Sequence, residues 1–281
     1  PPEIEIMPTQ REHPAATQVG ATWNERMLGL KYGVNLSCAP KITVGKAGNG
    51  LHFHMMAVKN DKNMLVADGQ LSNLAKKMIA GILDVSTALT AFGNTVPTSY
   101  LRLVPNQEAP TYVCWGDRNR SVLVRVPLGW LHSNNMLQHA NPGESQPKEL
   151  PNRQTFEFRV PDGSADIHYL LAGLVAASRH GIEMPDALDK AEKLYAPVDI
   201  FKEAFKDQLG ELEQLPDSCH TSADALAKYR EVFEENHIFP KGTIDATINN
   251  LKAYEDKNLS EDLYGNNEAI SDLVNKYLHA K

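Results

Sequence analysis

The chain has 281 residues, of which 42% are hydrophobic and 22% are charged, and these proportions are typical of a globular protein with a buried core. Its formal net charge of −7 argues against a nucleic-acid-binding protein, because no basic stripe is present to meet a phosphate backbone. No apolar run reaches the ~18 residues that a membrane span requires. The three cysteines are widely spaced, without a CxxC pair, which favours a reducing cytoplasmic location over a disulfide framework.

The N-terminal part begins with Pro1-Pro-Glu-Ile-Glu5, without an initiator Met or signal sequence, and we therefore interpret the chain as part of a longer protein. Alternation over residues 3–7 predicts a strand. Residues 22–32 are predicted to form a helix, with Gly33 as its C-cap.

The next segment, residues 45–63, has a glycine-rich turn followed by an alternating run. Residues 45–50 are the turn, and 51–58 are predicted to form a strand with His52 and His54 on one face. Residues 60–63 (Asn-Asp-Lys-Asn) predict a hairpin turn.

A helix is predicted after this hairpin, from an N-cap at Ser72 to about residue 90. Residues 91–111 contain Gly and three prolines and are predicted to form a long ordered loop, of the kind that often carries function. Two strands are predicted at 112–115 and 121–126, joined by a turn.

The remainder changes from strands to helices. Residues 127–153 are polar and predict a mobile flap, and 165–180 predict a buried helix that Gly181 stops. Strands followed by helices favour an α+β fold over a doubly wound α/β sheet. Further helices are predicted at 186–194, 200–213, 222–235, 243–256 and 267–278.

The most informative run is Phe156-Glu-Phe-Arg-Val-Pro-Asp162. A period of two places Glu157 and Arg159 on one face of a strand and the apolar residues on the other. A rigid carboxylate beside a guanidinium suits a metal ion next to an anionic group. The simpler interpretation of this run alone is an ion pair on a solvated sheet face.

This run and three segments upstream of it resemble one family in order and spacing. They resemble glutamine synthetase over most of residues 3–182, with a weaker likeness in the C-terminal helices, and residues 5–12 are similar to that family's acidic metal-binding segment. The segments are Ala47-Gly-Asn-Gly-Leu-His-Phe-His-Met-Met56, Asn94 with Ser99-Tyr-Leu-Arg-Leu-Val-Pro105 and Glu108-Ala-Pro110, Arg118-Asn-Arg-Ser121 with Arg125-Val-Pro127, and Phe156 to Asp162.

The resemblance implies a fold, an activity and an assembly. The fold would be a curved antiparallel sheet packed with helices, with a core at 1–182 and a helical C-terminal section of the same catalytic domain at 183–281. The activity would be ATP-dependent ligation of ammonia to glutamate through γ-glutamyl phosphate. The partners would be these small molecules and further copies in a ring-shaped homo-oligomer with active sites between subunits.

The resemblance also implies metal ligands. Mg²⁺ or Mn²⁺ would be held by His52 and Glu157 near the ATP phosphates, and by Glu5 and Glu12 near the glutamate carboxylate. Carboxylate oxygens suit these hard ions, and one imidazole is compatible with Mn²⁺. Taken alone, His52 is better interpreted as a satisfied sheet histidine. For Glu5 and Glu12, ordinary solvated acids near a terminus are the less favoured alternative.

Substrate contacts follow from the same match. Arg102 and Arg159 would bind the carboxylates of glutamate, and Gly48 would allow a close backbone approach, although a plain turn explains Gly48 equally well. Arg120 and Arg125 would grip the ATP phosphates with their planar forks.

Two further roles complete the implied site. His54 would line the nucleotide pocket. Glu108 would bind ammonium and accept a proton during attack. Arg120 and Arg159 would join Glu108 as catalytic residues by stabilising the charge of the transferring phosphoryl group.

Departures from the family pattern keep two alternatives open. Ala47 replaces a usual Asn, Met56 replaces a small polar residue, and Asn152 and Thr155 stand where basic residues are common. The family's N-terminal β-grasp domain is absent from this sequence. The alternatives are a ligase that joins γ-glutamyl groups to amines or polyamines, and a non-catalytic structural or regulatory relative.

Overall fold

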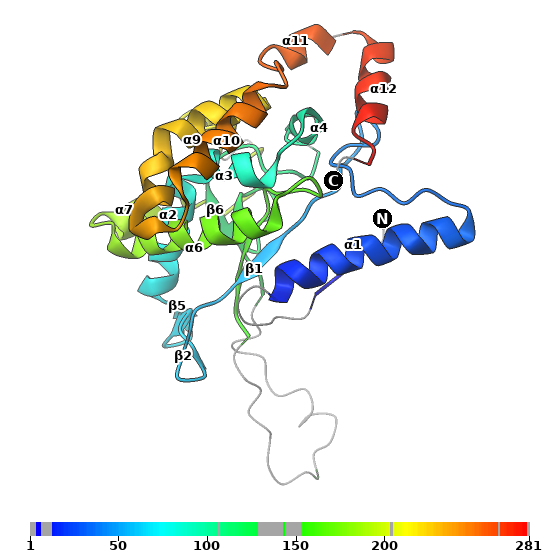
Figure 1. Ribbon diagram of the computed structural model, residues 1–281. Coiled ribbons are helices and arrows are strands. Elements are labelled where there is room, and N and C mark those ends of the chain that lie inside the picture. Colours follow the sequence, from blue (N-terminus) through cyan, green and yellow to red (C-terminus); the bar gives the residue numbers. More distant parts are fainter. Residues whose placement is uncertain are drawn as a thin grey trace.

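The computed structural model describes residues 4–6, 13–105, 107–128, 143, 153–202, 205–263 and 265–279. Within them, helices pack on a four-stranded sheet, and two small two-stranded sheets lie to one side. Figure 1 shows most helices gathered over the sheet, while α1 projects away from them. This is the predicted α+β class.

The main sheet has the order β1-β8-β7-β6. The strands are β1 (Phe53–Met55), β8 (Phe156–Phe158), β7 (Val124–Val126) and β6 (Trp115–Asp117). Pairs β1/β8 and β8/β7 are antiparallel, as predicted.

The pair β6/β7 is parallel and departs from the predicted antiparallel sheet. The connection between the two strands loops back, so that the Leu123 N–H donates to the Cys114 carbonyl at 3.1 Å. Asn119 joins this connection to the segment that lies beside β6, because its amide donates to the carbonyls of Ala196 at 3.1 Å and Val198 at 2.6 Å.

The predicted strand 51–58 is divided between two sheets. Its middle forms β1, and its end forms β2 (Val58–Lys59), which pairs with β3 (Lys62–Asn63). The predicted hairpin turn is confirmed: Asn60 and Asp61 have φ of 51° and 59°, as in a tight two-residue hairpin. A second pair joins β4 (Val66–Ala67) to β5 (Gln70–Leu71).

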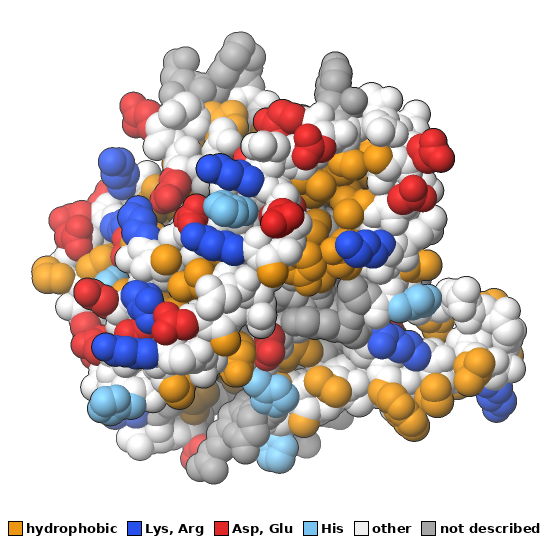
Figure 2. Space-filling model, turned by 45° about the horizontal axis from the view of Figure 1, so that its top comes forward, with side chains coloured by type: hydrophobic (Ala, Val, Ile, Leu, Met, Phe, Trp, Pro, Cys, Tyr) orange, Lys and Arg blue, Asp and Glu red, His pale blue; other side chains and the backbone are white. Residues whose placement is uncertain are grey.

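The N-terminal expectations are partly wrong. Residues 4–6 form no strand, and helix α1 (His13–Tyr32) starts well before the predicted position. Its end is confirmed, because Gly33 has φ +67° and the Val34 N–H donates to the Gly29 carbonyl at 3.0 Å. The outer face of α1 carries exposed apolar side chains, and Figure 2 shows them along the projecting arm.

The predicted helix 72–90 is two helices, α2 (Asn73–Asp84) and α3 (Ser86–Gly93), separated at Val85. The Ser72 cap is confirmed, since its hydroxyl accepts from the Ala75 N–H at 3.1 Å. The loop predicted at 91–111 is partly wrong, because α3 extends into it and α4 (Pro97–Tyr100) interrupts it.

Helix α6 (Ile167–Glu183) does not stop at Gly181. A Cβ at Gly181 would lie 2.1 Å from the Lys77 carbonyl oxygen and 2.6 Å from the Gly81 nitrogen. The glycine therefore serves a close crossing of α6 with α2. The flap predicted at 127–153 lies largely outside the described residues.

The C-terminal section is helical, as predicted, but the helix predicted at 200–213 shrinks to a single turn. None of the helices in the described ranges is both long and apolar enough to cross a membrane. The elements are α7 (Ala187–Lys193), α8 (Lys206–Leu209), α9 (Cys219–Glu234), η2 (Glu235–His237), α10 (Lys241–Lys252), α11 (Leu259–Leu263) and α12 (Asn267–Lys276).

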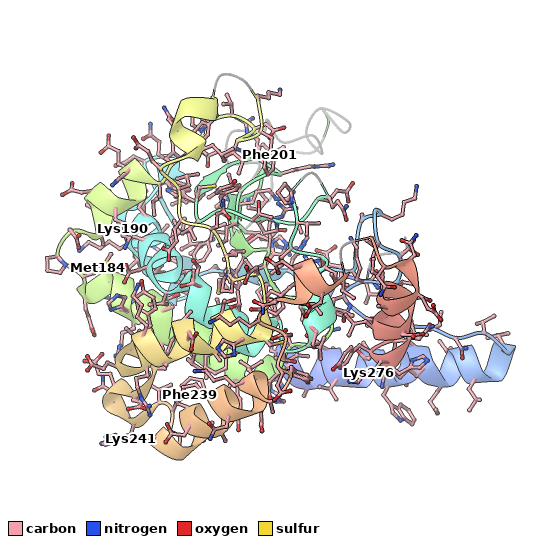
Figure 3. The ribbon with its side chains drawn as sticks, turned by 90° about the horizontal axis from the view of Figure 1, so that it is seen from above. Met184, Lys190, Phe201, Phe239, Lys241 and Lys276 are labelled. Atoms are coloured by element: carbon pink, nitrogen blue, oxygen red, sulfur yellow. The ribbon has the colours of Figure 1, made fainter. Side chains whose placement is uncertain are left out.

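One hydrophobic core joins the sheet to the C-terminal helices. Phe92 of α3 stacks on Phe239 with ring centroids 5.1 Å apart and meets Phe233 of α9 edge-on at 5.4 Å. Phe239 is labelled in Figure 3 beside α9 and α10. The boundary between the two sections at residues 182 and 183 stays a prediction.

Candidate active site

The site forms on the face of the main sheet opposite the core. The register places His54, Glu157 and Arg125 side by side across β1, β8 and β7. Their strand neighbours Phe156 and Phe158 are buried on the other face. Alternation therefore directs charge to one side of the sheet and apolar side chains to the core.

Glu157 lies at the centre of this charged face and is 0% exposed. Its Oε2 accepts from Arg125 Nε at 2.8 Å. Its Oε1 lies 2.9 Å from His52 Nδ1 and 3.4 Å from Arg159 Nε, but no described residue gives Oε1 a hydrogen bond of good geometry. The carboxylate thus keeps one buried oxygen whose hydrogen bonding is incomplete.

The surroundings hold Glu157 ionised. Burial opposes its charge, but contact with His52 and the charges of His52, Arg125 and His54 outweigh burial and lower the pKa of Glu157 to about 2. Burial, the main cause, lowers the pKa of His54, against the raising effect of Glu157. At neutral pH the His54 imidazole is therefore uncharged while the neighbouring Glu157 carboxylate is ionised.

Arg159 is held from two sides and is 5% exposed. Its Nη1 donates to the Arg120 carbonyl and, at 3.3 Å, to that of Val122. Burial lowers the pKa of Arg159, while the negative charges of Glu157 and Glu108 raise it. The Arg159 guanidinium thus interacts electrostatically with both predicted acids, Glu157 on the sheet and Glu108 in the loop.

Arg102 is 3% exposed and lies against the glycine-rich turn. Its Nη1 donates to the Val160 carbonyl at 2.7 Å, and its Nη2 to that of Arg159 at 3.3 Å. A Cβ at Gly48 would lie 2.2 Å from the Pro40 oxygen and 3.0 Å from Arg102 Cγ. Only glycine permits this packing, so the structure brings Gly48 and Arg102 together.

Glu108 is exposed at the edge of the site, in the loop after α4, and has φ +64°. Arg120 is also exposed, at the end of the turn that leads into β7. Neither side chain makes a hydrogen bond within the described residues, so both are available to a ligand.

Three residues beside the predicted ones were missed by sequence reasoning. Gly50 packs so closely that a Cβ there would lie 2.5 Å from Arg102 Nη2. Lys41 is fully buried and its ammonium donates to the side chain of Gln107. Gly50 shares the Gly-rich turn with Gly48 and was detectable; nothing local distinguishes Lys41 or Gln107 from surface residues.

The metal-ligand predictions can be compared with the donors present. His52 and Glu157 supply a nitrogen and an incompletely bonded buried oxygen, a donor set that fits Mn²⁺ or Mg²⁺. Glu5 is exposed, and its charge raises the pKa of His54. Glu12 lies outside the described residues, and no group of three or more His, Cys, Asp or Glu within the described ranges is arranged to hold an ion.

A cavity lies on the other face of the sheet. It has a volume of about 1000 Å³ and is lined by Trp115, Asp117 and Val126, among others. These residues share the sheet face of Val124, opposite Arg125. The charged cluster around Glu157 is therefore separate from this cavity.

Comparison with known proteins identifies the family. A family model described as glutamine synthetase, catalytic domain, matches residues 22–266. The chain belongs to the glutamine synthetase family. The match spans the sheet, the loop of Glu108 and most of the C-terminal helices.

Relatives named glutamine synthetase agree with this assignment. One from Pyrococcus furiosus is 34% identical over 203 residues, covering 72% of this chain and 41% of the relative. One from Methylococcus capsulatus is 33% identical over 229 residues, covering 80% of this chain and 43% of the relative. The chain thus spans less than half the length of these family members.

Solved structures show the same fold. A Plasmodium falciparum glutamine synthetase has a TM-score of 0.66 at 22% identity, covering 86% of this chain and 51% of its own. A structure described as a novel glutamine synthase homolog has a TM-score of 0.63 at 21% identity, covering 93% and 52%. At these identities the likeness concerns the fold of the glutamine synthetase catalytic domain.

Proposed function

We propose that this catalytic domain serves an ATP-dependent ligase that joins ammonia to the γ-carboxylate of glutamate through γ-glutamyl phosphate. The observation that carries the proposal is the convergence of Arg125, Arg159 and His52 on the buried carboxylate of Glu157. A structural protein does not need such a cluster, because burying charge is costly.

The arginines can offset the negative charge that accumulates in this reaction. Phosphoryl transfer to a carboxylate brings two anions together, and cations must offset the charge that accumulates. Arg120 and Arg125 would bind the ATP phosphates, with His54 beside the nucleotide. Arg159, between Glu157 and Glu108, would bind both glutamate and the transferring phosphoryl group.

The glutamate end would lie at the glycine-rich turn. Arg102 uses one hydrogen on each terminal nitrogen for backbone carbonyls, which leaves another on each to meet a carboxylate. Gly48 brings the backbone close to Arg102, where a Cβ would clash with the Pro40 oxygen and press on the Arg102 side chain.

Divalent metal fits the acidic part of the site. His52 and Glu157 would hold Mg²⁺ or Mn²⁺, and Glu5 and Glu12 would contribute to a second ion. Such ions, when bound, would neutralise phosphate charge. The chain's own part is to keep Glu157 ionised, which its surroundings favour.

Glu108 would act on the ammonia. Its carboxylate is exposed on a loop and acts electrostatically on Arg159. A carboxylate there can attract NH₄⁺ and accept the proton released as nitrogen attacks the acyl phosphate. Assembly into a ring with sites between subunits, and a cytoplasmic location, stay predictions of the resemblance.

Formation of γ-glutamyl hydroxamate tests the proposal. The full chain is incubated with glutamate, hydroxylamine, ATP and Mg²⁺ or Mn²⁺, alongside Arg159→Ala and Glu108→Ala. We expect ATP-dependent product that is lost in Arg159→Ala, only modestly reduced in Glu108→Ala because uncharged hydroxylamine depends little on that carboxylate, and retained in Glu211→Ala, which changes an exposed acid.

The outcome also separates the alternatives. Product with amines or polyamines but not with ammonia would assign the chain to an amine ligase. A folded, oligomeric preparation without product and without Mn²⁺ binding would contradict the ligase and favour the non-catalytic relative.

A further inference from the structure

Lys41 is a buried cation to which the proposed reaction assigns no role. It is 0% exposed and among the largest fully buried side chains of the described residues. It makes no ion pair within that part of the chain, and both burial and the positive charge of Arg102 lower its pKa. A buried ammonium without a carboxylate is unfavourable, so packing alone does not account for a lysine at this position.

The ammonium joins two loops that carry predicted substrate residues. Its Nζ donates to the carbonyl of Lys46, within the turn that leads to Gly48, and to Oε1 of Gln107, the residue before Glu108. One nitrogen thus fixes the glutamate side and the ammonia side of the site together.

The first loop is already rigid without Lys41. The Asn49 N–H donates to the Pro40 carbonyl at 3.0 Å, and the Asn49 amide donates to that of Ala39 at 2.8 Å. Gly48 also packs directly against Pro40 and Arg102. These contacts hold the backbone next to Lys41 in place, and the Lys41 side chain extends from it.

The second loop needs such a tether. Glu108 has φ +64°, a left-handed conformation that non-glycine residues seldom adopt and that neighbouring contacts must maintain. Ala109 and Pro110 after it are buried, which anchors the loop on that side. On the other side, Gln107 is held through Lys41.

We propose that Lys41 is a positioning residue, which tethers Gln107 to the glycine-rich turn and thereby holds Glu108 in place to receive ammonium and its proton. This inference rests on the proposed function for what Glu108 does, but the tether itself is independent of it. Loss of the tether should affect the ammonia half of the reaction more than nucleotide binding.

Hydrogen exchange tests the tether without relying on activity. Lys41→Met replaces the ammonium with an apolar side chain of similar length. We expect backbone amides of residues 107–113 to exchange faster in this variant than in the unaltered chain, and amides of α6 to be unchanged. Lys193→Met, which changes an exposed lysine on α7, is the matched control. Unchanged exchange at 107–113 would overturn the proposal.

Kinetics then test what the tether does. Ammonium is charged at neutral pH and needs Glu108, whereas hydroxylamine is mainly uncharged and depends on it less. We expect Lys41→Met to lower ammonia-dependent turnover about tenfold or more, hydroxylamine-dependent turnover by about threefold or less, and KM for ATP to stay within about twofold. Equal losses with both acceptors would contradict the positioning role.

A second variant covers the case in which Lys41→Met fails to fold. Gln107→Leu removes the same contact from the loop, and it should reproduce the unequal loss. The double variant Lys41→Gln/Gln107→Lys, which swaps the two side chains, should recover part of the ammonia-dependent turnover that Lys41→Met loses. A double variant with no recovery would count against the tether. If the unaltered chain has no ligase activity, the proposed function fails while hydrogen exchange still decides whether the tether exists.

Discussion

At the scale of single residues, the buried carboxylate of Glu157 determines what the charged face can do. It is enclosed by Arg125, Arg159 and His52, and the two guanidinium groups would be left without this counter-charge if Glu157 were neutral. Removing one partner of a buried ionic cluster costs more than the cluster contributes in net stability. The same carboxylate therefore serves both stability and the proposed metal site.

Glu157→Gln should consequently destabilise the fold. We expect the free energy of unfolding to fall by about 3 kcal/mol, because Arg159 remains buried without its carboxylate. Urea denaturation in the presence of a chelator measures this. Glu183→Gln, at a side chain that is 58% exposed, should change it by less than ~0.5 kcal/mol. Equal effects at both positions would show that the cluster is not a stabilising element.

His52→Ala should weaken Mn²⁺ binding by about tenfold or more, because it removes the imidazole donor beside Glu157. Electron paramagnetic resonance of free Mn²⁺ during a titration measures the affinity. The matched control is His180→Ala, which alters a histidine paired with Asp84 at 2.8 Å outside the site. A loss of affinity in the control alone would contradict the assigned ligand.

At the scale of elements, the crossing of α2 and α6 is decided by glycine. Gly81 and Gly181 face each other, and a Cβ on either would lie within 2.6 Å of the other's backbone nitrogen. Isolated helices favour Ala over Gly by about 1 kcal/mol. Here the clash opposes this preference, because two backbones in contact cannot move aside as a flexible side chain can.

Gly181→Ala should therefore destabilise the protein by about 2 kcal/mol or more despite its better helix propensity. Thermal unfolding followed by circular dichroism measures the change. Gly242→Ala in α10, where a Cβ would meet nothing within 4 Å, should be neutral or slightly stabilising. If Gly181→Ala were as stable as Gly242→Ala, the close crossing would be wrong.

A second inter-element contact makes stability depend on pH. Asp84 at the end of α2 pairs with His180 of α6 at 2.8 Å and with Lys190 of α7, and Lys190 is labelled in Figure 3. The bond from His180 is the main cause, and Lys190 adds to it, so that the pKa of Asp84 falls from 3.8 to about 2. A lowered carboxyl pKa stabilises the folded state above the unfolded value and ceases to do so as the pH falls through the folded value.

Asp84→Asn should thus cost about 1 kcal/mol at pH 7, and the difference from the unaltered chain should shrink as the pH falls from 4 towards 2. Urea denaturation across this range measures it. Asp272→Asn, at an exposed acid on α12, should show no such convergence. A constant difference at every pH would mean that the charge of Asp84 is not responsible.

At the scale of the whole molecule, the C-terminal helices share the core of the sheet. Leu226 and Phe233 of α9 belong to the same buried cluster as Phe92, Phe156 and Phe158. A shared core predicts that both sections unfold together, since neither can lose its packing without exposing the other.

Urea denaturation should therefore give coincident transitions by far-ultraviolet circular dichroism, which reports on all helices, and by tryptophan fluorescence, to which the buried Trp115 contributes. Two separate transitions would contradict a single cooperative core and would make residues 183–281 a domain of their own.

The sequence alone predicted local features of the fold better than features that depend on distant contacts. Helix caps and turns were predicted correctly at Ser72, Gly33 and Asn60 because each depends on the conformational preferences of a few neighbouring residues. The site residues were named through family motifs, and alternation predicted that Glu157 and Arg159 share one face of their strand. The length of α1, the break at Val85 and the parallel pairing of β6 depended on contacts that no local pattern specifies.

The sequence by itself thus determined the α+β class, the order of its elements and the charged runs that form the face around Glu157. Tertiary structure decided which distant residues come into contact. Its results are the cluster on Glu157, the contact between Gly81 and Gly181 where α2 crosses α6, and the tether from Lys41 to Gln107. Backbone preference and side-chain alternation act within a few residues, so a sequence displays them directly. Lys41 and Gln107 are distant along the chain, and packing of the whole molecule is what makes them neighbours.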